Sequence, residues 1–426
     1  MSKKAITKTT AILTLMIIVL AAVVIYYVTL PRPVGPATIT GKVTDAKTGA
    51  PILGATVKLN GLAYITGPDG TYSLKVTVGD YKLTVTMTGY EAKTTSVSAK
   101  EEKTYTVDIV LAHKYKMALM VGGDETDAGF SFMAIQGAYR IRDKYGWEID
   151  ISRLVSFADQ ERVASDYASR GYDLVFAVGG QFISTTYFGV VKQYNDTYFA
   201  QVPGLEFPRP PPNVVGLHPA FQTVGHYLAG VLAGKMTKTN AVAAIFGEWY
   251  PYLSMEFYAF KAGVESVNTQ AKVYARVAGT WGDASIGYQI ASALIKTKNV
   301  DIIVQVADTT GRGVIAACQQ FNTMVIGTVA DQAVLAPNVT LTSIGMDTPL
   351  FMEMVVQSVM NGTFKQKLGG TVADVNIGGF LYPFHEFEKV VPQSVKDLLK
   401  KTSDDINKGV ITVPRKVTEK PPPDPT

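Results

Sequence analysis

The sequence predicts an α/β protein of two lobes built on parallel sheets, preceded by a small β-sandwich and an apolar N-terminal segment. Three patterns predict this architecture. Apolar, strand-like runs alternate with helical patterns over residues 113–415, short β-branched runs separated by turns fill residues 37–112, and a mostly apolar run covers residues 11–30. At 426 residues, the chain is long enough for two or three domains.

Composition narrows the classes of function. Hydrophobic residues make up 47% of the chain and charged residues 18%, which is typical of a protein that folds. Forty Lys and Arg residues against 36 Asp and Glu residues leave a net charge of +4, too small a bias to indicate a nucleic-acid partner. Cys318 is the one cysteine, and the histidines lack the spacing of metal ligands: His113, His218, His226 and His385. The sequence therefore predicts no disulfide, no metal site and no cofactor.

Residues 1–30 have the pattern of an uncleaved membrane anchor. Lys3, Lys4 and Lys8 precede the apolar run, which is long enough to cross about 30 Å of hydrocarbon. Because the basic residues come first, we expect the rest of the chain to lie outside the cell. Removal of the segment as a secretory signal is the alternative.

A further alternative concerns how the N-terminus is processed. Lys4-Ala5-Ile6 resembles the cleavage site of archaeal pilin-like signal peptides, in which a charged and a small residue precede the hydrophobic segment. Cleavage would then follow Ala5, and the protein could belong to an archaeal cell surface. Such an N-terminus would also suit a filament or surface-layer protein, in which the α/β domain serves only for packing.

Three tripeptides match the N-x-[ST] pattern of glycosylation, and they begin at Asn195, Asn338 and Asn361. An extracellular location would make these asparagines candidates for glycans. Chance also supplies such tripeptides in a long chain, so unmodified surface loops are the alternative.

Residues 31–36 are interpreted as a stiff spacer because they hold three prolines, and residues 37–112 as a small β-sandwich. The β segment resembles the carboxypeptidase regulatory-like family in GKVTDAKTGAPILGATVKLNG, TGPDGTYSL and GDYKLTVTMTGY. It offers no nucleophile, metal cluster or general base. We interpret it as a spacer that holds the larger domain away from the membrane, with ligand binding as the alternative.

The glycine-rich loop after the first strand of the large domain is a candidate ligand site. It reads VGGDETDAGFSF, and its acidic residues, which include Asp127, would repel a phosphate but suit a ligand with N–H or O–H groups. Capping of the following helix is the alternative role for Asp127. Phe130 is placed to stack on a flat ligand, or else packs into the core. Ligands bind where loops leave the carboxyl ends of parallel strands, so we expect a cleft between the lobes.

Around this loop the sequence resembles the basic membrane protein family, the type I periplasmic binding proteins of ABC transporters that capture purine nucleosides or bases. The resemblance rests on DAGFSFMAIQG, HYLAGVLAGKMTKTNAVAAIFG, FKAGVESVN, AGTWGDAS, VDIIVQVADTTGRGV and IGTVADQ, in this order. It implies a two-lobe protein without enzymatic activity that closes about a hinge and docks on a membrane permease. Phe130 would stack on the base from the first lobe, with Asp127 as a polar partner.

The same resemblance implies ligand contacts from the second lobe. Trp249, Tyr250 and Trp281 would supply the opposing aromatic ring, and Asp308 and Asp331 would hold hydroxyl or amino groups of the ligand. One departure bears on the ligand. Nucleoside-binding members carry a lysine soon after the Thr-Ser pair of the last core strand, whereas residues 342–347 read TSIGMD. This puts ribose recognition in doubt and favours a free base or another flat ligand.

Two other features concern cofactor binding and the C-terminal end of the chain. The run GRGVIA at residues 311–316 has the form of a dinucleotide-binding fingerprint, which would indicate an enzyme, but it lies deep in the second lobe rather than in a first βα unit. The proline-rich residues 416–426 predict a disordered tail.

Overall fold

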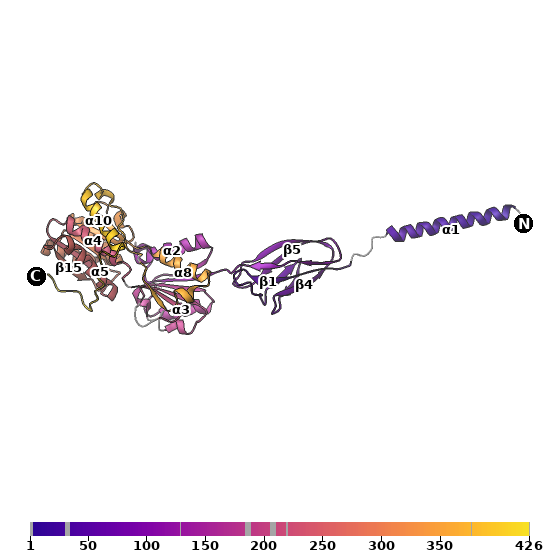
Figure 1. Ribbon diagram of the computed structural model, residues 1–426, viewed down its shortest axis with the longest axis horizontal. Coiled ribbons are helices and arrows are strands. Elements are labelled where there is room, and N and C mark those ends of the chain that lie inside the picture. The colour runs from indigo at the N-terminus through magenta and orange to yellow at the C-terminus, as the bar shows by residue number, and fades with distance from the viewer. Residues whose placement is uncertain are drawn as a thin grey trace. The chain divides into compact units, whose positions relative to one another are not determined.

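A computed structural model describes residues 3–29, 35–127, 129–183, 189–204, 210–218, 220–375 and 377–425. The chain forms two compact units, Met1–Lys114 and Tyr115–Thr426 (Figure 1). Residues 31–34 of the predicted spacer lie outside the described residues.

The first unit begins with one long helix. α1 covers Lys3–Thr29, and its section Thr10–Val28 has a mean hydropathy of 2.8 with no part of it buried. Among the described residues it is the one helix that is long and apolar enough to cross a membrane, by length and composition.

A β-sandwich follows in the same unit. One sheet contains β1 (Ala37–Asp45), β4 (Thr71–Val76), β7 (Thr104–Thr106) and β8 (Ile109–Leu111), and the other contains β2 (Thr56–Leu59), β3 (Leu62–Ile65), β5 (Gly79–Thr86) and β6 (Lys93–Ala99). Side chains alternate between core and solvent, as in β4, where Tyr72, Leu74 and Val76 are buried. This alternation is what the β-branched sequence pattern predicts.

Lobe one of the second unit has a six-stranded parallel sheet. Its order is β10 (Glu148–Ser152), β9 (Lys116–Val121), β11 (Leu174–Val178), β12 (Tyr198–Val202), β13 (Val214–Leu217) and β19 (Thr371–Ala373). The helices of this lobe are α2 (Phe130–Tyr145), α3 (Gln160–Ser169), α8 (Thr348–Met360) and α9 (Phe364–Lys367). Figure 1 shows α2, α3 and α8 around this sheet.

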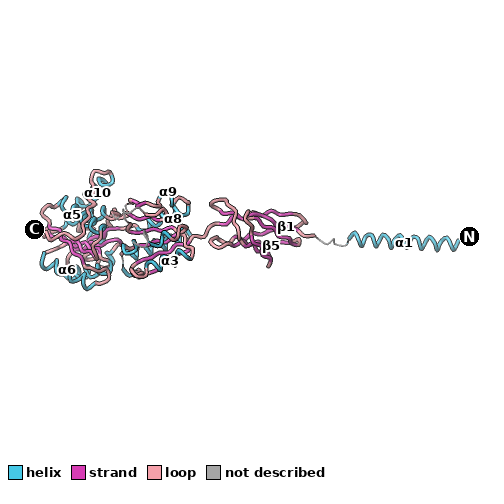
Figure 2. Tube along the Cα trace, turned by 90° about the horizontal axis from the view of Figure 1, so that it is seen from below, coloured by secondary structure: helices cyan, strands magenta, loops and turns pink. Residues whose placement is uncertain are grey.

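Lobe two has a five-stranded parallel sheet with the order β15 (Lys272–Val277), β14 (Ala241–Phe246), β16 (Ile302–Val306), β17 (Met324–Val329) and β18 (Thr340–Gly345). Its helices are α4 (Thr223–Met236), α5 (Pro251–Val267), α6 (Ala284–Lys298), α7 (Asp308–Phe321) and α10 (Gln393–Asn407). Figure 2 shows helices on both sides of the magenta strands. The chain enters lobe two after β13, returns after β18 and leaves lobe one again after β19, so the lobes share several crossing segments.

The tail, predicted to be disordered, is instead attached to lobe two. The Thr418 backbone N–H donates to Ser254 Oγ at 2.8 Å, and the Trp249 indole donates to the Thr418 carbonyl at 3.0 Å. Asp424 pairs with Arg276 at 2.6 Å and with Lys298 at 3.0 Å. Composition shows that such a segment cannot build a core of its own, but it does not reveal partners on another part of the chain.

The run GRGVIA does not form a phosphate-binding loop. Gly311 and Gly313 lie inside α7, where a Cβ on Gly313 would come within 1.7 Å of the Ala284 carbonyl oxygen. Gly313 therefore lets α6 and α7 pack closely, while Gly311 makes room for the side chain of Gln305.

Candidate ligand-binding site

A cavity of about 620 Å³ lies between the two lobes. Its walls come from the loops that follow β9, β10 and β11 in lobe one, and from the loops after β14, β15 and β16, the end of β17 and the first turns of α5 in lobe two. These are the carboxyl ends of parallel strands, where α/β proteins bind ligands. Five of the predicted site residues line it: Asp127, Phe130, Tyr250, Trp281 and Asp308.

Asp127 both caps α2 and lines the cavity. Its carboxylate accepts hydrogen bonds from the backbone N–H groups of Gly129 and Ser131, each at 2.8 Å, and of Phe132 at 3.0 Å. The side chain is buried. Because these donors occupy most of its lone pairs, Asp127 has little capacity left for a ligand. Asp127 therefore mainly stabilises the conformation of the loop that carries Phe130.

Aromatic rings form a continuous row along the cavity. The Phe130 ring lies 6.4 Å from that of Phe221, which lies 6.3 Å from that of Tyr252. Tyr252 in turn stacks on Tyr250 at 5.9 Å and 21°. The row thus leads from lobe one to lobe two, at spacings that suit aromatic contacts.

Sequence reasoning missed Phe221 and Tyr252. Phe221 lies between the end of β13 at Leu217 and the start of α4 at Thr223, so it too follows a strand end. Tyr252 had a usable signal, since it is two residues after Tyr250 in the first turn of α5.

Trp281 and Glu248 form the lobe-two edge of the cavity. The Trp281 indole lies so close to the backbone of Gly247 that a Cβ there would come within 2.5 Å of the ring. Its Nε1 donates to Glu248 Oε2 at 2.9 Å, and the Tyr250 hydroxyl hydrogen-bonds the same oxygen. Glu248, which the sequence analysis did not single out, therefore orients two rings.

Asp308 is the point at which lobe two touches the loop of lobe one. It begins α7 with a φ of 45°, and the backbone N–H of Phe130 donates a hydrogen bond to it. Burial and the negative charge of Asp127 raise the pKa of Asp308 to about 7.

Val329, at the end of β17, also lines the cavity, and like Asp308 it has a positive φ, in its case 71°. Strained backbone of this kind concentrates at functional sites.

Glu256 is the fourth carboxyl group of the cavity wall, and it comes from the interior of α5. It is 1% exposed, and burial raises its pKa well above the usual value. Its Oε2 lies 3.5 Å from Nε2 of buried His226, but neither atom has a hydrogen-bond partner among the described residues. Burial lowers the pKa of His226 to about 4, so the imidazole is neutral near pH 7.

Two predicted site residues do not line the cavity. Trp249 packs edge-on against Phe246, with ring centroids 5.3 Å apart, and donates to the tail. Asp331 accepts a hydrogen bond from the Ala333 backbone and pairs with His385 Nε2 at 2.7 Å. Both follow a strand end, as predicted, but their described contacts are with the tail, Phe246, Ala333 and His385.

The three asparagines of the N-x-[ST] tripeptides, Asn195, Asn338 and Asn361, are all exposed. This is the placement that glycosylation requires, and the modification stays a prediction.

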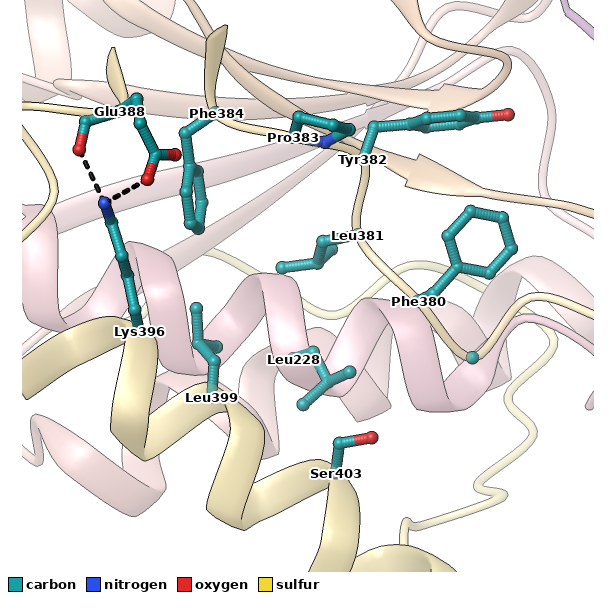
Figure 3. Close-up of a pocket in the computed structure, with 11 residues that line it drawn as sticks. Leu228, Phe380, Leu381, Tyr382, Pro383, Phe384, Glu388, Lys396, Leu399 and Ser403 are labelled. Carbon is teal, nitrogen blue, oxygen red and sulfur yellow. Dashed lines mark hydrogen bonds and ion pairs between the residues drawn. The ribbon is translucent and has the colours of Figure 1, made fainter. Parts of the chain in front are cut away.

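A second hollow, of about 450 Å³, lies within lobe two between α10 and residues 379–384 (Figure 3). Its lining is mostly apolar, with Phe384 and Leu399 pointing toward each other across it. Its described charged residues are Glu388 and Lys396, which pair with each other. It therefore has no free charged group for a ligand, unlike the cavity between the lobes.

The fold and the cavity define a two-lobe solute-binding protein. Residues 114–416 match the family model described as ABC transporter substrate-binding protein PnrA-like, and residues 38–112 match that of the carboxypeptidase regulatory-like domain. The chain belongs to the PnrA-like family of ABC transporter substrate-binding proteins, and it carries a carboxypeptidase regulatory-like domain before it. Both resemblances seen in the sequence are thereby confirmed.

Curated relatives agree with the family. Basic membrane protein A of Borreliella afzelii is 25% identical over 304 residues, which cover 70% of this chain and 90% of the relative. The ABC transporter nucleoside-binding protein BmpA of Lactococcus lactis is 27% identical, over 66% of this chain and 84% of the relative. A purine-binding protein of Brucella abortus is 24% identical, over 60% of this chain and 71% of the relative.

A solved structure shows the same fold. The ABC transporter solute-binding protein from Aeropyrum pernix K1 aligns with a TM-score of 0.63 and 20% identity, and the match covers 71% of this chain and 94% of that one. The predicted two-lobe α/β architecture is confirmed.

Proposed function

We propose that this protein is the extracytoplasmic, membrane-anchored substrate-binding protein of an ABC importer, and that it captures a purine base or nucleoside. The observation that carries the proposal is the row of rings at the cavity, which starts on lobe one at Phe130 and ends on lobe two at Tyr252 and Tyr250. A flat ligand can stack on these rings while carboxyl groups meet its N–H groups. The names of the relatives from L. lactis and B. abortus support this ligand class.

In the proposed mechanism the ligand first stacks on one lobe and the second lobe then closes over it. The closed form docks on a membrane permease. Asp308 contributes to closure because it already meets the backbone of Phe130 in the opposite lobe. No covalent step is needed, so the protein acts as a binder and not as an enzyme.

Thermal unfolding of the full chain in detergent tests the proposal against nucleosides, free purines, pyrimidines, sugars and amino acids. A ligand at a hundred times its dissociation constant should stabilise the protein by about 2.7 kcal/mol. We expect a purine or nucleoside to raise the melting temperature, and Trp281→Ala to reduce that rise. Phe380→Ala is the control, because Phe380 lines the second hollow. If no purine or nucleoside raises the melting temperature, the purine assignment fails. If no compound of the panel raises it, a structural role for the protein replaces the proposed binding function.

A further inference from the structure

The cavity between the lobes has a one-sided charge. Its described lining residues include four carboxyl groups, from Asp127, Glu248, Glu256 and Asp308, and no lysine, arginine or histidine. An anionic ligand such as a nucleotide would meet repulsion from those carboxyl groups that are ionised, in a site of low dielectric whose described lining offers it no cation. Among flat, nitrogen-rich ligands, the charge of the cavity therefore disfavours those that are anionic.

The four carboxyl groups differ in what they can still bind. Asp127 is taken up by three backbone N–H groups, and Glu248 by the Trp281 and Tyr250 side chains. Asp308 and Glu256 are the two carboxyl groups that can still bind a ligand. The hydrogen bond that Asp308 receives from Phe130 leaves most of its acceptor capacity unused.

Glu256 is an independent indication of a ligand. Its side chain is about 99% buried on the cavity wall, and Oε2 lacks a hydrogen-bond partner among the described residues. The neighbouring atom, His226 Nε2, is unpartnered too, and His226 Nδ1 is engaged with the Gln222 carbonyl at 3.0 Å. A buried carboxyl oxygen without a hydrogen-bond partner destabilises the fold, and a ligand that supplies an N–H group to that oxygen removes the cost.

The proximity of Asp308 to Asp127 also favours a ligand with N–H groups or a positive charge. The two carboxyl groups come from different lobes, and the charge of Asp127 disfavours a charge on Asp308. A positive charge placed beside Asp308 would turn this repulsion into attraction as the lobes close. The faces of Phe130 and Tyr252 would add cation–π attraction.

We propose that the cavity selects a flat organic cation, such as an N-alkylated or protonated nitrogen heterocycle or an amidinium, whose N–H groups or charge meet Asp308 and Glu256. This rests on the proposed function, because it specifies the ligand of the same cavity. It narrows the ligand from purines in general to those flat nitrogen compounds that carry a positive charge.

Calorimetric titration of the full chain in detergent with two pairs of probes tests the inference. Benzamidine and benzamide share one shape and differ in charge, and 1-methyladenosine carries a positive charge at neutral pH that adenosine lacks. We expect each cation to bind at least about tenfold more tightly than its neutral counterpart, which equals about 1.4 kcal/mol. Asp308→Asn and Glu256→Gln should each reduce this preference, whereas Glu388→Gln, in the second hollow, should preserve it.

The outcomes separate this inference from the proposed function. Equal or tighter binding of the neutral members overturns the cation inference, while binding of adenosine leaves purine capture standing. A preference for benzamidine with no binding of either nucleoside supports the cation and counts against an adenine nucleoside as the ligand. Failure of all four probes overturns both. If Glu256→Gln does not fold, Asp308→Asn decides, since asparagine preserves the shape and can still accept from Phe130.

Discussion

Asp308 is the residue of the cavity whose charge depends most directly on the other lobe. Its carboxyl group is held against the other lobe by the Phe130 backbone and lies within the field of Asp127. A raised pKa in the folded state means that the fold binds the proton more tightly than the unfolded chain does. The pKa rises from 3.8 to about 7, so Asp308 destabilises the unliganded protein progressively as pH rises from about 4 to about 7.

The first prediction follows from this sign. Without ligand, Asp308→Asn should raise the melting temperature relative to wild type at pH 8, and the difference should shrink as pH is lowered toward 4. Thermal unfolding across this pH range measures it. Because His226 is present in both proteins, its own destabilising effect in acid cancels in the comparison. An Asn variant that is no more stable at pH 8 would contradict the assigned repulsion.

The second prediction concerns the fit between Gly247 and Trp281. Gly247→Ala places a Cβ within 2.5 Å of the indole, so the ring must shift and its hydrogen bond to Glu248 must distort. We expect the free energy of unfolding to fall by about 1–3 kcal/mol and ligand affinity to fall with it. Denaturant unfolding and calorimetry measure the two effects. The matched change Gly282→Ala, where no atom lies within 4 Å of the added Cβ, should leave stability unchanged; equal losses from both would refute the packing argument.

Some of the site could be predicted from single residues and some could not. Phe130, Trp281 and Asp308 follow strand ends, and the carboxyl edge of a parallel sheet is where such residues gather. Glu256 has no such signal, because it lies inside a helix whose neighbouring residues are apolar. A sequence shows that a strand has ended but not which way the next side chain turns, and for this reason it does not reveal that Trp249 and Asp331 lie outside the cavity lining.

At the scale of elements, the alternation of buried strands and helices was predictable because parallel strands are apolar throughout, as in AVAAIF of β14. The helix that follows the glycine-rich loop is α2, which begins at Phe130. The tail was not predictable. Its partners Trp249, Ser254 and Arg276 are far away in the sequence and lie side by side only after lobe two has folded.

The third prediction is that the tail supports the cavity. Deletion of residues 416–426 removes its hydrogen bonds to Trp249 and Ser254, which flank Tyr250 and Tyr252 of the cavity. Each hydrogen bond contributes about 1 kcal/mol, so we expect stability to fall by about 1–3 kcal/mol and ligand binding to weaken. Denaturant unfolding and titration of the shortened chain measure this. Asp424→Asn, which loses only the exposed ion pairs, should have a smaller effect; a deletion without any effect would show that the tail is not a support.

At the scale of the whole molecule, the chain divides into two compact units, Met1–Lys114 and Tyr115–Thr426. The unit Tyr115–Thr426 has its own hydrophobic cores in both lobes. The fourth prediction is that a chain beginning at Tyr115 folds and binds ligand with the affinity of the full chain, while only the full chain sediments with membranes. Titration and membrane fractionation test the two halves. Loss of binding on removal of residues 1–114 would give the β-sandwich a direct part in the site.

The central claim is that a flat ligand is held between the aromatic rings of the two lobes. Calorimetric titration of the full chain with purine bases, nucleosides and the charged probes tests it most directly, with Phe130→Ala and Tyr252→Ala beside Phe380→Ala. The account predicts one ligand per chain, with affinity reduced about tenfold or more by either of the first two changes and unaltered by the third. Binding that survives both Phe130→Ala and Tyr252→Ala, or no binding at all, would contradict it.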